Sequence, residues 1–231
     1  MPPVSDLAIY HNLMLERFGP RHWWPGDSPF EVALGAILTQ NTAWTNVAKA
    51  LGNLKAIAPL NPAAIAALPD ERLAQAIRPS GYYNQKVIKI RNLLAWFREY
   101  SGEDSPEAFA DASLGFLHGI SLPALRESLL NVKGVGPETA DCILLYALGL
   151  PTFVVDAYTW RMLRRHGFVG EDTNYYEMQS LFTSALPEDV AVYNECHALI
   201  VKLGQEHCKK TKPLCESCPL FDYLDYPVFE E

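Results

Sequence analysis

The chain has 231 residues, of which 49% are hydrophobic, 20% charged and 11% aromatic, and its formal net charge is -8. This composition excludes a disordered chain, a collagen-like repeat and a small disulfide-stapled scaffold. The acidic balance also excludes a protein that coats nucleic acid through bulk positive charge alone.

Apolar residues recur at helical spacing along most of the chain, whereas the alternation typical of strands is scarce. Pro and Gly interrupt this pattern repeatedly, as at Pro79, Gly81 and Gly149. The pattern predicts an all-α protein of about ten helices with short connections. In chain order, the expected helices cover residues 30–38, 43–54, 62–68, 73–77, 85–100, 122–132, 137–148, 157–166, 175–184 and 188–203.

The chain carries no visible targeting or membrane signal. Its longest apolar runs, such as 142–148, fall well short of the roughly 20 residues that a membrane-spanning helix needs. The first residues include Asp6 and lack the basic-then-apolar order of a signal peptide. We therefore expect a cytoplasmic protein whose 5 cysteines are thiols or metal ligands rather than disulfides.

Basic residues gather in three stretches despite the acidic total. Residues 78–98, 157–169 and 202–212 hold 12 of the 19 Lys and Arg residues, and Glu206 is the only acidic residue within them. Such stretches are either solvated helix faces or surfaces that flank DNA.

The segment 130–141 predicts two helices that meet across a glycine hairpin. The first helix ends at Val132, and Pro137 stands in the first turn of the second, where a missing N–H is tolerated. Glycines allow a ligand to approach the backbone closely, and the amides of such a turn suit phosphate oxygens, although ordinary helical elbows also contain glycine. The expected contact residues are Lys133, Gly134, Val135 and Gly136.

Asp156 follows two valines and precedes a basic helix that begins at Ala157. This position predicts a helix N-cap, at which the carboxylate accepts a backbone N–H of the first turn. Taken alone, the position is that of a simple cap.

The hairpin, the following helix and Val-Val-Asp together resemble the helix-hairpin-helix, Gly/Pro-rich loop and Asp signature of the endonuclease III superfamily of DNA glycosylases. Further similar segments are 38–42 (Leu-Thr-Gln-Asn-Thr), 81–86 (Gly-Tyr-Tyr-Asn-Gln-Lys) and the helix 197–208. The resemblance implies a bilobal fold, with a six-helix barrel lobe over 28–136 and a second lobe from 1–27 plus 137–231. It also implies a nucleoid-associated monomer of bacterial type that acts on double-stranded DNA with a damaged base.

The resemblance assigns DNA contacts to several residues. It implies that the hairpin anchors phosphates, often with a monovalent cation, and that Lys86 and Arg161 in the basic stretches contact DNA. Gln40 or Asn41 would fill the gap that a flipped base leaves in the duplex.

The position of Glu138 indicates the type of chemistry. In endonuclease III, a lysine in the second hairpin helix forms a Schiff base with the sugar, but a carboxylate at that position cannot form an imine. The resemblance then implies a monofunctional glycosylase in which Asp156 stabilises the oxocarbenium charge and orients or deprotonates water. Two alternatives stay open: a bifunctional glycosylase and lyase that acts on oxidised pyrimidines through Lys133 or Lys202, and a non-catalytic helix-hairpin-helix DNA-binding protein.

Aromatic residues near the start of the chain suggest the base. They resemble those of the bacterial 3-methyladenine DNA glycosylase branch, whose pocket stacks the damaged base, although tryptophans also pack cores. An alkylated purine is cationic, so an indole face offers it about 0.5 to 2 kcal/mol that a normal base does not obtain. The expected pocket residues are Trp23, Trp24, Pro25 and Trp44.

A cysteine loop near the end resembles the [4Fe-4S] loop of the superfamily. Cys208, Cys215 and Cys218 match the first three ligands, whereas Leu224 stands where the fourth cysteine is expected. Three possibilities stay open: an iron-sulfur cluster with a different fourth ligand, a zinc ion, or no metal. The candidate fourth ligands are Asp222, Asp225, His207 and solvent.

Overall fold

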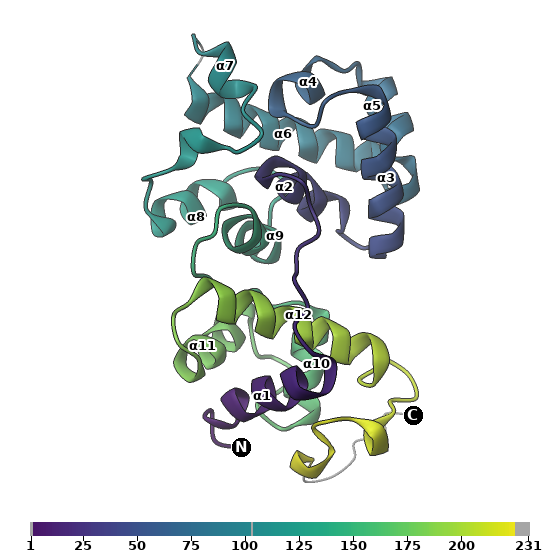
Figure 1. Cartoon of the computed structure of the whole chain (residues 1–231), viewed down its shortest axis with the longest axis vertical. Coiled ribbons are helices and arrows are strands. Elements are labelled where there is room, and N and C mark those ends of the chain that lie inside the picture. Colours follow the sequence, from purple (N-terminus) through teal and green to yellow (C-terminus); the bar gives the residue numbers. More distant parts are fainter. Residues whose placement is uncertain (1, 103, 225–231) are drawn as a thin grey trace. The chain divides into compact units, whose positions relative to one another are not determined.

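The computed structural model describes residues 2–102 and 104–224, and these residues form helices and turns without a strand (Figure 1). The predicted all-α class is therefore confirmed. The chain divides into two compact units, one of residues 24–150 and one of residues 1–23 with 151–231. These boundaries differ from those expected for the lobes, 28–136 and 1–27 plus 137–231. Among the described residues, no helix has the length and apolar character needed to cross a bilayer.

In the unit of residues 24–150, α2 is central because every side chain from Phe30 to Leu38 is buried. Its start is fixed by Ser28, whose hydroxyl accepts the N–H of Glu31 at 3.2 Å, and by Pro29 in the first turn. The helices of this unit are α2 (Pro29–Leu38), α3 (Trp44–Ile57), α4 (Pro62–Ala67), α5 (Asp70–Ile77), α6 (Tyr83–Ser101), α7 (Pro106–Phe109), α8 (Leu122–Leu130) and α9 (Pro137–Cys142).

In the other unit, α12 packs against α1 and α10. Apolar rings fill this core: the rings of Phe153 and Phe182 stack with centroids 4.0 Å apart, and Tyr193 meets Phe153 edge-on at 5.7 Å. The helices are α1 (Asp6–Phe18), α10 (Ala157–Arg165), α11 (Tyr175–Ala185) and α12 (Val190–Glu206). Single 3₁₀ turns, Cys215–Ser217 and Phe221–Tyr223, follow in the cysteine loop.

Three elements differ from the sequence prediction. The helix α1 was not predicted, although Leu7, Tyr10 and Met14 form its buried face, and neither was the short helix α7. The predicted helix 137–148 begins at Pro137 as expected, but its second half is a π-helical turn, Ile143–Ala147. In that turn the N–H of Leu148 donates to Ile143 O, five residues earlier, at 3.1 Å.

Candidate active site

The hairpin between α8 and α9 requires glycine at residue 134. Gly134 has a φ of 98°, a conformation that side chains other than glycine rarely adopt. A Cβ added there would also lie 2.5 Å from Cγ of Lys89 on α6. The backbone conformation and the packing against Lys89 therefore account for the glycine at residue 134, without any ligand.

Neither backbone conformation nor packing requires glycine at the second glycine position of the hairpin, residue 136. Gly136 is the N-cap of α9 with an extended backbone, φ -99°, and an added Cβ would meet no atom within 4 Å. The exposed amides of Gly134 and Gly136 have no acceptor in the described part of the chain. A side chain at residue 136 would instead obstruct a ligand that approaches these amides, which is the chemistry of a phosphate nest.

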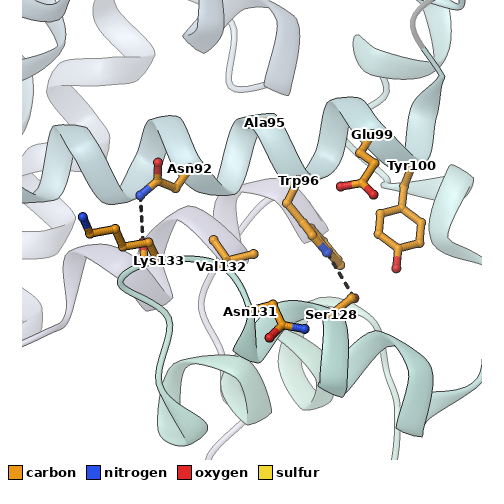
Figure 2. A pocket seen from close by; sticks show the side chains of 9 residues that line it. All are labelled: Asn92, Ala95, Trp96, Glu99, Tyr100, Ser128, Asn131, Val132 and Lys133. Carbon is orange, nitrogen blue, oxygen red and sulfur yellow. Dashed lines mark hydrogen bonds between the residues drawn. The ribbon is translucent and has the colours of Figure 1, made fainter.

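The hairpin is held in place by α6. The amide of Asn92 donates to Lys133 O at 2.8 Å, and the indole N–H of Trp96 donates to the hydroxyl of Ser128 on α8 at 3.1 Å (Figure 2). A pocket of about 410 Å³ lies beside these contacts and is lined by both α6 and the hairpin. The turn is thus presented on a rigid support, with the Lys133 side chain exposed.

The loop after α2 separates the roles of Gln40 and Asn41. The Gln40 amide donates to Gly134 O at 3.1 Å and to Thr139 Oγ1 at 2.9 Å, and its carbonyl accepts the Lys89 ammonium. Gln40 therefore fastens this loop to the hairpin. Asn41 is exposed at a φ of 54°, at the tip of the loop.

Lys86 does not have the role expected for it. Its side chain is buried, and Nζ donates to Leu38 O at 2.8 Å and to Ser80 O at 2.7 Å. Burial, together with the nearby charge of Lys89, lowers the pKa of Lys86 to about 8. The expected contact of Lys86 with DNA is wrong, because the ammonium instead joins the end of α2 to the turn before α6.

An aromatic cluster forms within the unit of residues 24–150. The Trp24 ring lies 5.2 Å from Trp44 in an edge-on arrangement and 5.4 Å from Tyr146 at an angle of 44°. Gly35 of α2 makes room for it, because an added Cβ would lie 3.3 Å from the indole nitrogen. All three rings are half-buried, so part of each remains accessible.

Sequence reasoning missed Tyr146, which is presented by the π-helical turn. No periodicity signal distinguishes this turn from the α-helix around it. Of the other two expected pocket residues, Pro25 is exposed, and the half-buried Trp23 belongs to the other compact unit. Their roles stay predictions.

Asp156 caps α10 as predicted. Its Oδ1 accepts the N–H of Thr159 at 2.8 Å and the Thr159 hydroxyl at 2.9 Å. Its Oδ2 lies 3.6 Å from Nε2 of His197 on α12, and the Asp156 side chain is only 13% exposed. The cap and the histidine thus approach different oxygens of one carboxylate.

This arrangement keeps Asp156 ionised. Burial acts most strongly and would raise its pKa, but the hydrogen bond and charge of His197, together with the Thr159 donors, outweigh it and lower the pKa of Asp156. An ionised carboxylate suits the stabilisation of positive charge rather than proton donation. His197 was not predicted to act here, because it lies 41 positions after Asp156 and no spacing rule pairs them.

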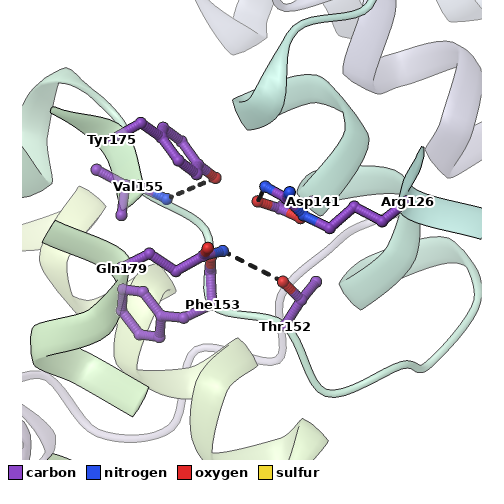
Figure 3. A network of polar contacts seen from close by, with 7 residues as sticks. All are labelled: Arg126, Asp141, Thr152, Phe153, Val155, Tyr175 and Gln179. Carbon is purple, nitrogen blue, oxygen red and sulfur yellow. Dashed lines mark hydrogen bonds and ion pairs between the residues drawn. The ribbon is translucent and has the colours of Figure 1, made fainter. Parts of the chain in front are cut away.

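The backbone that leads to Asp156 is fixed by α11. Gln179 donates through Nε2 to Phe153 O at 2.6 Å and to Thr152 Oγ1 at 3.2 Å, and the N–H of Val155 donates to the Tyr175 hydroxyl at 3.4 Å (Figure 3). The segment 152–155, which precedes the carboxylate of Asp156, is therefore buried and held by hydrogen bonds.

A buried ion pair joins the two helices of the hairpin. Arg126 of α8 binds both oxygens of Asp141 on α9, at 2.7 and 2.9 Å, and the Asp141 side chain is fully buried (Figure 3). Such a bidentate pair fixes the two helices in one register.

The three loop cysteines line one small cavity, together with Leu224 and His207. No three His, Cys, Asp or Glu side chains in the described ranges meet closely enough to bind a single metal ion. In an iron-sulfur cluster each thiolate binds a different iron, so the three thiols need only to line one cavity. Cys208, Cys215 and Cys218 would hold such a group.

Arginines of α10 attach this loop to the helix that Asp156 caps. Arg161 donates through Nε to Cys208 O at 2.6 Å, and Arg165 donates to Cys208 Sγ at 3.3 Å and to Lys209 O at 2.8 Å. The Nε group of the half-buried Arg161 is thus already bound within the protein, and the contact of Arg161 with DNA stays a prediction.

A family model described as the HhH-GPD superfamily base excision DNA repair protein matches residues 34–188. The chain is 41% identical, over 92% of its length and 93% of the relative's, to a protein of Methanocaldococcus jannaschii described as a candidate DNA repair glycosylase. It is 28% identical to endonuclease III of Escherichia coli K12, over 87% of this chain and 85% of that one.

Solved structures agree with these matches. A trapped endonuclease III-DNA covalent intermediate is similar at a TM-score of 0.79 and 25% identity, with 97% of each chain covered. The H. pylori 3-methyladenine DNA glycosylase MagIII, bound to 1,N6-ethenoadenine, is similar at a TM-score of 0.69 and 31% identity, covering 88% of this chain and 97% of that one. The chain therefore belongs to the HhH-GPD superfamily of base excision DNA repair proteins and is a DNA glycosylase.

Proposed function

We propose that this glycosylase is monofunctional and releases an alkylated purine such as 3-methyladenine from double-stranded DNA. The observation that carries the substrate proposal is the half-buried cluster of Trp24, Trp44 and Tyr146. Electron-rich faces favour a cationic base over a neutral one. The similarity to MagIII supports the same class of lesion.

Asp156 supplies the chemistry of bond cleavage. As the N-glycosidic bond breaks, the cationic purine leaves as a neutral base and positive charge develops at C1′ of the sugar. The ionised carboxylate stabilises that charge and accepts a proton from the attacking water, whose oxygen becomes the new C1′ hydroxyl. Because the alkylated base is already a good leaving group, the reaction requires no general acid.

The hairpin anchors the DNA backbone in this proposal. The amides of Gly134 and Gly136 bind a phosphate, with Lys133 beside them. A monovalent cation at the turn would bind backbone carbonyl groups of the hairpin together with the same phosphate. Asn41 fills the gap left by the flipped base, because the Gln40 amide is already bound to Gly134 O and Thr139 Oγ1.

The test is base release from two duplexes, one treated with a methylating agent and one carrying oxidised pyrimidines. Free bases are separated and identified by mass. We expect 3-methyladenine from the first duplex and no base from the second. Release of oxidised pyrimidines alone would refute the proposal.

A second candidate is a glycosylase and lyase that acts on oxidised pyrimidines. The similarity to the trapped endonuclease III-DNA covalent intermediate favours it. Glu138 opposes it, as do the surroundings of one alternative lysine, since Lys202 is paired with Glu206 one helical turn later on α12. Lys133, which is exposed on the hairpin, is the lysine on which this candidate would depend.

A further inference from the structure

The cysteine loop resembles one that holds a four-iron cluster, but it offers three thiols, those of Cys208, Cys215 and Cys218. Cys208, Cys215, Cys218 and Leu224 line the same cavity. The backbone thus brings residue 224 to the place of a fourth ligand, whereas its side chain is a hydrocarbon that cannot bind iron. We propose that this loop holds a [4Fe-4S] cluster with three cysteine ligands, whose fourth iron faces Leu224 and binds water or a small external thiol.

Arg165 provides independent support for a negatively charged group in this cavity. Its side chain is buried, and its partners are Cys208 Sγ and the carbonyls of Lys209 and Lys210. No carboxylate pairs with it in the described part of the chain, although a buried guanidinium is costly without a counter-charge. A doubly positive [4Fe-4S] core with three thiolates carries one net negative charge, which balances the one positive charge of Arg165.

Among the described residues, the other candidate ligands for the fourth iron are poorly placed. Asp222 is exposed and does not line the cavity, and Asp225 lies outside the described residues. His207 lines the cavity, but its Nδ1 shares a hydrogen bond with the Ser217 hydroxyl at 3.2 Å and its ring packs against Phe18. Leu224 is therefore the residue that defines the open corner.

An iron without a protein ligand should be lost selectively. Ferricyanide removes one electron from [4Fe-4S]²⁺, and the resulting [4Fe-4S]³⁺ releases Fe²⁺ from the open corner to leave [3Fe-4S]⁺. Fe²⁺ with a reductant should rebuild the four-iron form. A cluster with four thiolates holds all its irons more firmly under the same treatment.

The experiment uses the full chain, reconstituted anaerobically with Fe²⁺ and sulfide, with iron and acid-labile sulfide measured per chain. After brief ferricyanide oxidation, we expect the EPR signal of a three-iron cluster to be at least about tenfold larger for wild type than for Leu224→Cys. Leu214→Cys is the matched control, because residue 214 is exposed and lies outside the cavity, and it should behave as wild type.

Three results with wild type would overturn the proposal, and a fourth comes from a histidine variant. Wild type could bind no iron and sulfide after reconstitution, it could bind a single zinc ion, or its oxidation could resemble that of Leu224→Cys. His207→Gln tests the histidine directly: the three-iron signal should equal that of wild type, and a marked rise would show that His207 had occupied the fourth corner. None of these measurements depends on the lesion that the enzyme excises.

Discussion

The two compact units prepare their functional groups in different ways. In residues 24–150, shape dominates: a glycine turn exposes amides, and Gly35 makes room for Trp24 in a cluster of rings. In the other unit, charge dominates: the Asp156 carboxylate lies against His197, and the Arg165 guanidinium lies against Cys208. Substitutions in the first unit should therefore alter recognition, and those in the second should alter chemistry.

The largest expected effect comes from Asp156→Asn. Asparagine caps a helix about as well as aspartate, so the fold should be retained while the charge is lost. We expect single-turnover release of 3-methyladenine to fall by about 10²- to 10⁴-fold, with DNA affinity still measurable by fluorescence anisotropy.

The matched control is Asp189→Asn. Asp189 caps α12 in the same unit by accepting the N–H of Val192 at 3.0 Å. Its release rate should stay at the wild-type value. If Asp156→Asn were as active as this control, the carboxylate would have no part in the reaction.

Trp44→Leu tests the aromatic cluster. Loss of base stacking worth about 1 to 3 kcal/mol should lower kcat/KM for the alkylated duplex by about five- to 150-fold. Trp96→Phe is the control, because Trp96 is buried in the same unit but outside the cluster. It should lower stability without changing the preference for alkylated over neutral bases, and an equal loss for every base with Trp44→Leu would argue against cation recognition.

The two hairpin glycines should separate folding from binding. Gly134→Ala forces a left-handed backbone and a contact with Lys89, so the free energy of unfolding should drop by about 1 to 3 kcal/mol. Gly136→Ala should leave denaturant unfolding nearly unchanged, yet weaken DNA binding by about tenfold through a lost phosphate contact. Unchanged affinity in Gly136→Ala would remove the hairpin from the DNA-binding surface.

Features whose residues lie close together along the chain could be predicted from sequence. The hairpin, Pro137 in its first helical turn and the Asp156 cap all follow from local spacing. Contacts between distant residues could not be predicted this way, and the pairing of His197 with Asp156 is one example.

The number of basic residues in a stretch of sequence also did not indicate how many of their charged groups are exposed and unpaired. Within 78–98, Lys86 is buried, and Arg91 pairs with Asp70 at 2.8 Å. In 157–169, Arg164 pairs with Glu171 at 2.8 Å and Arg165 is buried. Several basic residues that suggested a DNA path from sequence thus hold the protein itself together.

His197→Gln should have the smallest effect, and it depends on pH. Wild-type Asp156 has a lowered pKa, so its rate should stay nearly constant as the pH falls from about 8 to about 5. Without His197 only the Thr159 donors oppose burial, so the pKa of Asp156 should rise and part of the carboxylate should become protonated at the acid end. The variant should therefore lose activity at about pH 5 but keep most of it at about pH 8, whereas an equal loss at both would indicate only a structural role.

The most direct test of carboxylate-driven hydrolysis is borohydride trapping on duplex DNA that contains 3-methyladenine, with strand integrity followed in the same reaction. The account predicts free base, an abasic strand that breaks only on alkali treatment, and no covalent enzyme-DNA adduct. A trapped adduct that disappears in Lys133→Ala, together with strand cleavage at neutral pH, would contradict it.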